Sequence, residues 1–262
     1  MAPRLRTTGP GLLRGYSHGH RRVVVCFHHA GGGMSAYRGW AQALAPVTDV
    51  VLVQLKGRED RIAEPLTDHL DDLALDIARG VCAMPYDDVV LLGHSMGATL
   101  AWAVADAVWS VYRRRVQVVV SAQAPPPYDP AAVGALFAPG DGCAGAMDVF
   151  EGVGGTAAGA VGTVYADTLD ADLAWMSREF PALPVRALPV DLYCVAAEQD
   201  RLLAPSAMAG WASLTTRRFT RSTVPGGHMY LLADPSPLVR LVKELALRDS
   251  AERTAVDGHP LS

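Results

Sequence analysis

Gly93-His94-Ser95-Met96-Gly97 is the stretch of sequence that decides the fold. It follows an apolar run over residues 89–92 and precedes a segment with helical character over residues 98–102. A serine between two glycines, after a strand and before a helix, has the pattern of a nucleophile elbow. The turn is too sharp for side chains on either side of it, so both flanking positions need glycine. The helix that follows turns free N–H groups toward a reacting carbonyl, where negative charge develops.

Short apolar runs alternate with helical patterns along the rest of the chain. Because the apolar runs are continuous rather than alternating, the strands should be buried on both faces, as in a parallel sheet. Alternation of strands with helices predicts a doubly wound α/β fold, with a mostly parallel sheet flanked by helices. The predicted strands cover residues 23–27, 50–55, 89–92, 116–120, 190–197 and 218–224, and the predicted helices cover residues 40–44, 70–81, 98–111, 206–211 and 237–247.

The pattern predicts one domain over residues 19–248 with an insertion at about 125–188. The insertion starts at Ala124-Pro125-Pro126-Pro127, is rich in glycine and alanine, and is too long for an ordinary connection. Its apolar residues favour a mobile lid subdomain, with a helix over residues 169–180, over a disordered linker. Residues 1–18 and 249–262 are polar and without periodicity, so we expect both ends to be frayed or disordered.

The composition limits the classes of function. The 262 residues carry a net charge of -4, and 50% of them are hydrophobic, which is typical of a globular protein that does not bind nucleic acid. We see no signal peptide and no apolar run of membrane-spanning length, and we expect a cytoplasmic protein. The cysteines and histidines are scattered without metal-ligand spacing, so we predict no metal and no cofactor.

A serine hydroxyl is a weak nucleophile, so Ser95 needs a base and an acid that orients the base. In folds with such an elbow the chain order is serine, acid, histidine. After Ser95 there are two histidines, His228 and His259. His228 follows a predicted strand and two glycines, whereas His259 lies in the polar tail. We therefore predict His228 as the base.

The acid should lie at the carboxyl end of a strand between Ser95 and His228. Asp200 follows the strand predicted over residues 190–197 directly, and catalytic groups gather at such ends in open α/β sheets. Glu198 is the competing candidate. Asp191 starts the strand and would lie at the opposite edge of the sheet. We predict Asp200 as the acid.

An oxyanion hole needs two backbone donors. The N–H of Met96, directly after the nucleophile, should supply one, and the loop His29-Ala30-Gly31-Gly32-Gly33 should supply the other through Ala30. We expect His29, Gly31 and Met229 to line the substrate site. A simple tight turn is the alternative for the glycines, and a phosphate-binding loop is disfavoured because no Gly-Lys-Ser/Thr follows.

Four stretches together make the chain resemble the type II thioesterases of nonribosomal peptide and polyketide synthesis, which are stand-alone α/β-hydrolases. Residues 26–32 resemble the family's F-P-H-A-G-G loop, and residues 54–61 its Q-x-P-G-R-E-x-R segment. The elbow at residues 93–98 and Gly226-Gly227-His228-Met229 match two further family stretches. The chain departs from the family pattern at His28 and Lys56, where the family has proline. We interpret Arg58 as part of an ion-paired structural loop.

The resemblance implies hydrolysis of acyl or aminoacyl thioesters from the phosphopantetheine arm of an acyl or peptidyl carrier protein, a transient partner of a monomeric enzyme. Ser95 would form an acyl-enzyme, His228 would move the proton, Asp200 would orient His228, and Ala30 and Met96 would bind the oxyanion. Three alternatives stay open. They are an acyltransferase that passes the acyl group to an amine or alcohol, a carboxylesterase acting on free esters, and a binding module without activity.

Overall fold

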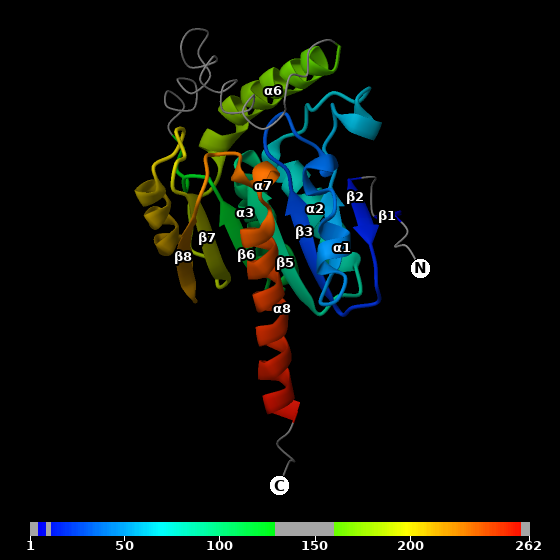
Figure 1. The fold of residues 1–262 in the computed structure, drawn as a ribbon, viewed down its shortest axis with the longest axis vertical. Helices are drawn as coiled ribbons and strands as arrows, with labels where there is room; N and C mark the ends of the chain where they lie inside the picture. The colour runs from blue at the N-terminus through cyan, green and yellow to red at the C-terminus, as the bar shows by residue number, and fades with distance from the viewer. Residues whose placement is uncertain (1–4, 9–11, 129–159, 258–262) are drawn as a thin grey trace.

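The computed structural model describes residues 5–8, 12–128 and 160–257, which form one layered α/β body (Figure 1). Its centre is a sheet in the order β1-β2-β4-β3-β5-β6-β7-β8. All neighbouring strands from β4 to β8 are parallel, and β1 and β2 join them antiparallel. The strands are β1 (Leu5–Thr8), β2 (Leu13–Tyr16), β3 (Arg22–Phe27), β4 (Asp49–Val53), β5 (Asp88–His94), β6 (Gln117–Ser121), β7 (Asp191–Ala197) and β8 (Phe219–Val224).

The inner strands β3, β4, β5, β6 and β7 are largely apolar and buried because helices cover both faces of the sheet (Figure 1). Along β3, Val23 and Val25 contribute to one core and Val24 to the other, as the alternation of strand side chains requires. Helices α2 (Leu70–Ala83) and α3 (Met96–Tyr112) pack into the first core, and α1 (Trp40–Leu44) and α8 (Ser236–Asp257) into the second. The other helical segments are η1 (Met34–Tyr37), η2 (Glu59–Arg61), η3 (Phe180–Ala182), η4 (Pro205–Leu214) and α7 (Tyr230–Ala233).

The amino-terminal segment differs from the expectation of a frayed end. β1 pairs with β2, β2 pairs with β4, and the backbone N–H of Gln54 donates to the carbonyl of Leu12 at 2.7 Å. Leu12 and Leu13 are buried in the first core, so the segment contributes apolar side chains as well as backbone pairing at the sheet edge. The carboxyl end also differs, because α8 continues through Asp257. Residues 1–4, 9–11 and 258–262 lie outside the described residues.

The insertion contributes one long helix, α6 (Ala160–Glu179), to the described structure. It starts at Ala160 rather than at the predicted residue 169, and residues 129–159 of the insertion lie outside the described residues. Figure 1 places α6 across the end of the sheet at which the parallel strands finish. Leu169, Leu173 and Met176 anchor it in the first core, so α6 covers the edge where the predicted site residues converge.

Within the described residues, none of the helices combines the length and the apolar character that crossing a membrane requires.

Candidate active site

Ser95 occupies a strained turn between β5 and α3. Its backbone angles, φ 52° and ψ -125°, lie in a region that residues with side chains seldom adopt. A β-carbon on Gly93 would lie 2.0 Å from the carbonyl oxygen of Gly97, and one on Gly97 would lie 2.2 Å from that of Phe27. Both glycines are therefore required by close backbone packing. The turn raises the serine hydroxyl at the end of the strand, as the sequence pattern predicted.

The structure brings Ser95, His228 and Asp200 together from three separate loops. His228 Nε2 lies 3.0 Å from Ser95 Oγ, and His228 Nδ1 lies 2.8 Å from Asp200 Oδ2. The side chains of His228 and Asp200 are 5% and 1% exposed. Because the carboxylate can only accept, Nδ1 carries the proton and Nε2 is left to accept the proton of the serine hydroxyl. This is the geometry of a nucleophile, its base and an orienting acid.

Asp200 is held by its own loop. Its Oδ1 accepts the backbone N–H groups of Leu202 at 2.8 Å and Leu203 at 3.0 Å, which leaves Oδ2 directed at His228. The competing candidates lie elsewhere. Glu198 is exposed, and Asp191, at the start of β7, pairs with Arg217 at 3.0 Å.

The loop that carries the acid is joined to the loop that carries the base. The N–H of Gln199 donates to the carbonyl of Gly226 at 2.9 Å, and the N–H of Gly226 donates to the side-chain oxygen of Gln199. Gly226 has φ +108°, which favours glycine. The two loops follow β7 and β8, which are neighbours in the sheet. The loops therefore remain side by side beyond the carboxyl ends of these two strands.

The glycine loop after β3 lies directly against the elbow. Phe27 of β3 lies opposite Gly93 of β5 in the sheet. A β-carbon on Gly97 would lie 2.6 Å from the carbonyl oxygen of His28. Ala30 and Met96, the two predicted oxyanion donors, are both buried. Met96 is the first residue of α3, so its N–H has no partner within the helix. The start of α3 and the glycine loop therefore meet at the serine.

Three further imidazoles are buried near this loop. Desolvation lowers the pKa of His28, and it lowers the pKa of His29 to about 3, with electrostatic interactions with His228 and Arg58 as smaller causes for His29. Burial, followed by the electrostatic interaction with His228, lowers the pKa of His94 well below its ordinary value. All three are therefore neutral at pH 7. They are therefore packed neighbours of the site rather than proton carriers.

Ser121 and Tyr230 are polar neighbours of the site that the sequence did not single out. His94 Nδ1 lies 2.8 Å from Ser121 Oγ, which lies 2.6 Å from the Tyr230 hydroxyl. The backbone N–H of Ser95 donates to the carbonyl of Ser121 at 2.9 Å. These hydrogen bonds link the elbow to β6 and to Tyr230 of α7, the helix that follows His228.

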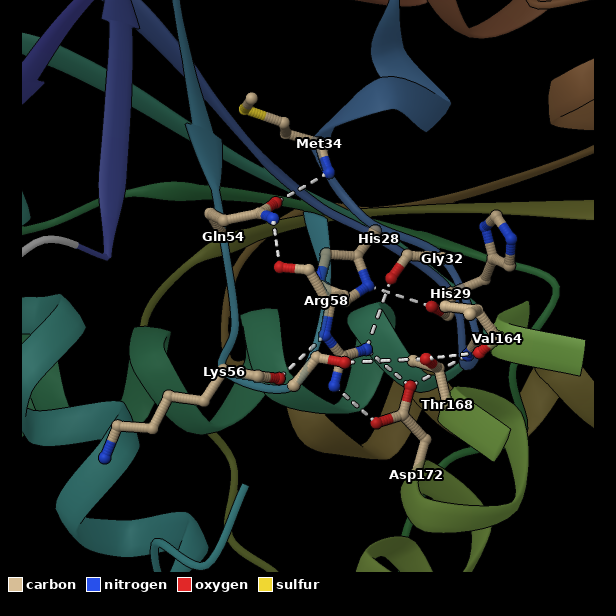
Figure 2. Close-up of polar contacts among 12 residues, drawn as sticks. His28, His29, Gly32, Met34, Gln54, Lys56, Arg58, Val164, Thr168 and Asp172 are labelled. Carbon is tan, nitrogen blue, oxygen red and sulfur yellow. Dashed lines mark hydrogen bonds and ion pairs between the residues drawn. The ribbon is translucent and has the colours of Figure 1, made fainter. Parts of the chain in front are cut away.

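Arg58 forms a buried ion pair with Asp172 of α6 (Figure 2). Both contacts of the guanidinium with the carboxylate measure 2.6 Å, and the two side chains are 4% and 0% exposed. The predicted ion-paired role of Arg58 is thereby confirmed. Asp172 itself was missed, although a signal exists. It shares one helix face with Leu169 and Met176, and a carboxylate in an apolar stripe requires a partner.

A groove of about 590 Å³ runs along the glycine loop under α6. His29 and Gly31, two of the predicted substrate-binding residues, line it, whereas Met229 is buried and is not among its lining residues. Three of its lining side chains are large, apolar and exposed to solvent: Ile62, Val164 and Leu232. The groove therefore offers an accessible apolar surface next to the loop that approaches Ser95.

Comparison with known proteins places the chain in a family. A family model described as a thioesterase domain matches residues 22–245. The chain belongs to this thioesterase family. The probable cadicidin biosynthesis thioesterase of Streptomyces griseus is 30% identical over 216 residues, which cover 79% of this chain and 58% of that relative. The thioesterase described here thus spans less than two thirds of that curated relative.

Two solved structures of thioesterases share the fold. The type II thioesterase BorB from the borrelidin biosynthetic cluster has a TM-score of 0.72 and 27% identity, with 90% of this chain and 96% of that chain covered. The RedJ thioesterase from the prodiginine pathway of Streptomyces coelicolor has a TM-score of 0.71 and 30% identity, with 87% and 91% covered. These matches confirm the resemblance to type II thioesterases and the α/β-hydrolase fold.

Proposed function

We propose that this thioesterase hydrolyses acyl or aminoacyl thioesters from the phosphopantetheine arm of an acyl or peptidyl carrier protein. The observation that carries the proposal is the hydrogen-bonded series from Ser95 through His228 to Asp200, at 3.0 Å and 2.8 Å, in a chain of the thioesterase family. The partner is transient, because it leaves once its arm is free.

In the proposed reaction, His228 Nε2 takes the hydroxyl proton as Ser95 Oγ attacks the thioester carbonyl. The oxyanion that forms accepts hydrogen bonds from the backbone N–H groups of Met96 and Ala30, and Asp200 stabilises the imidazolium. Collapse of the intermediate breaks the carbon–sulfur bond, and the proton on His228 goes to the leaving thiolate. Water then attacks the acyl-enzyme, with His228 as base, which releases a carboxylic acid and restores the serine.

The groove along the glycine loop supports a substrate that arrives on a long arm. It is open to solvent, and Ile62, Val164 and Leu232 give it apolar walls suited to an acyl chain or to the apolar parts of the arm. Two relatives are named for biosynthetic pathways, those of cadicidin and prodiginine. These names favour a carrier-bound substrate over a free ester.

The test is to measure release of acid from an acyl carrier protein, from the same acyl group on coenzyme A, and from its p-nitrophenyl ester. We expect kcat/KM to be highest for the carrier protein, Ser95→Ala to abolish release, and Asp200→Asn to lower kcat by roughly 10⁴-fold. Arg79→Ala, which removes an exposed ion pair on α2, serves as the control. Ser95-independent release would contradict the mechanism. Preference for the free ester, or transfer to an amine or alcohol in place of water, would contradict the proposed substrate or reaction.

A further inference from the structure

The peptide unit between His29 and Ala30 is held by two donors to its carbonyl oxygen. The N–H of Gly32 donates to this oxygen at 3.1 Å, and His28 Nδ1 lies 2.9 Å from it. Because a carbonyl only accepts, His28 carries its proton on Nδ1. In a trans peptide the N–H points away from the C=O. Binding of the His29 carbonyl therefore directs the Ala30 N–H to the opposite side.

The next two residues of the loop, Gly31 and Gly32, are held by the ion pair between Arg58 and Asp172 of α6. Figure 2 shows the contact between Arg58 and Gly32. Asp172 Oδ2 accepts the N–H of Gly31 at 2.8 Å, and Arg58 Nη1 donates to the carbonyl of Gly32 at 3.2 Å. Gly31 has φ +74°, and a β-carbon there would lie 3.1 Å from Tyr165 and from Leu169. The loop is thus fixed by polar contacts on both backbone groups and by close packing against α6.

Arg58 is itself anchored, so the ion pair is not a loose contact. Its Nε donates to the carbonyl of Lys56 at 2.9 Å, and its own carbonyl accepts from Gln54 Nε2 at 3.1 Å. Gln54 Oε1 accepts the N–H of Met34, at the far end of the glycine loop, at 2.9 Å. Figure 2 shows this continuous set of contacts from Met34 to Asp172. The glycine loop is therefore held at Gly31, Gly32 and Met34 by one hydrogen-bonded network, which consists of Gln54, Arg58 and Asp172.

Stability alone gives a poor account of this arrangement. Burying an arginine and an aspartate costs desolvation free energy, and apolar side chains of similar volume are often as stable. His28, 2% exposed, is a second buried polar side chain directed at the same loop. Two separate polar groups thus converge on the backbone that carries Ala30.

We propose that His28 and Asp172 are positioning residues that orient the Ala30 N–H toward the oxyanion. His28 acts through the carbonyl of the same peptide unit, and Asp172 acts through the adjoining N–H of Gly31. The proposal rests on the proposed function, since the oxyanion is that of its tetrahedral intermediates. It assigns a role to His28, one of the two positions at which this chain has another residue in place of the family's proline.

The decisive experiment compares His28→Leu with His28→Asn. Asparagine can place its Nδ2 donor near the position of the imidazole Nδ1, whereas leucine has no donor. The readouts are kcat and KM on an acyl-coenzyme A thioester, and the affinity for a trifluoromethyl ketone analogue, which forms an oxyanion with Ser95. We expect His28→Leu to lower kcat roughly 10- to 100-fold, somewhat less than the loss of a whole oxyanion donor, with KM within about twofold. Affinity for the ketone should fall by the same factor, and His28→Asn should restore most of both.

Asp172→Asn should act in the same direction, since it keeps one acceptor but loses the ion pair with Arg58. Asp88→Asn is the matched control, because Asp88 pairs with Arg22 at 3.0 Å at the opposite end of β5. It should leave kcat and ketone affinity unchanged. If the Asp172 variant does not fold, the two His28 variants decide alone.

Unchanged kcat in His28→Leu overturns the positioning role, and so does a loss of kcat without loss of ketone affinity. Neither result affects the proposed function, which fails separately if Ser95→Ala still releases acid from the thioester.

Discussion

Gly97 and Phe27 are in backbone contact: a β-carbon on Gly97 would lie 2.2 Å from the carbonyl oxygen of Phe27. The first turn of α3 therefore rests directly on the end of β3, the neighbouring strand. This contact joins the two parts of the site that must stay in register, namely the serine elbow and the glycine loop.

Gly97→Ala should consequently disable the site as well as destabilise the fold. Because backbone atoms cannot rotate out of the way, we expect a loss of about 1–3 kcal/mol in the free energy of unfolding and loss of labelling by a serine-directed phosphonate. Gly227→Ala is the steric control, since a β-carbon there would lie 3.7 Å from its nearest neighbour, an ordinary contact. Urea unfolding and labelling rates measure both effects. Full labelling of a stable Gly97→Ala protein would contradict the steric account.

Stability should fall as the pH drops below 6.5, because buried imidazoles must stay neutral in the folded state. The pKa of His29 is lowered from 6.5 to about 3, so below pH 6.5 the unfolded chain binds a proton that the folded chain does not. Stabilisation is therefore complete above pH 6.5 and lost on acidification, by about 2 kcal/mol for His29 at pH 5. The lowered pKa values of His28 and His94 act in the same direction.

Urea unfolding at pH 7.5 and pH 5 checks this prediction. His29→Asn should reduce the difference between the two free energies of unfolding, whereas His18→Asn, at an exposed position, should leave it unchanged. Equal stability of the parent protein at both pH values would show that the buried imidazoles do not control acid stability.

Removing one partner of the buried ion pair should lower the free energy of unfolding more than removing both partners does. Asp172→Leu leaves the guanidinium of Arg58 buried and unpaired, for which we expect a loss of about 3–5 kcal/mol. Arg58→Met combined with Asp172→Leu should regain most of this loss. It should not regain kcat, because the Gly31 N–H still lacks its acceptor. A double variant with normal kcat would mean that the pair serves packing alone.

A charge in the apolar groove should weaken binding of the carrier-bound substrate. Leu232 is 37% exposed and lines the groove, so we expect Leu232→Asp to raise KM for the acyl carrier protein roughly 5- to 10-fold without changing kcat. Hydrolysis of p-nitrophenyl acetate, which is too small to need the groove, should be unaffected. Leu247→Asp, at an exposed position on α8 outside the groove lining, is the control. An unchanged KM would place the substrate on another surface.

The parallel strands and the site on their ends could be predicted because both depend on local patterns. Continuous apolar runs such as residues 89–92 determine burial on both sides of the sheet, and chain order with strand ends was enough to select Asp200 and His228. The edge hairpin could not be predicted in this way. β2 has four residues, including Arg14 and Gly15, and too few apolar positions for a period to be recognised.

The network of Gln54, Arg58 and Asp172 that holds the glycine loop depends on contacts that no local sequence pattern contains. Arg58 and Asp172 are 114 residues apart, and their pairing requires α6 to lie across the end of the sheet. The sequence indicates that Arg58, in a segment that resembles the family's, and Asp172, on an apolar helix face, each need a charged partner. It does not indicate that they are partners of one another. Packing of α6 decides that choice.

The pairing of Gln199 with Gly226 has a consequence for motion within the site. The Asp200 carboxylate and the His228 imidazole lie on loops that are hydrogen-bonded to each other. The Ser95 hydroxyl lies on a separate turn, which follows β5. Fluctuations should thus alter the hydroxyl–imidazole separation and leave the imidazole–carboxylate separation nearly constant. A downfield proton resonance from the Nδ1–H of His228 should accordingly survive in Ser95→Ala and vanish in Asp200→Ala.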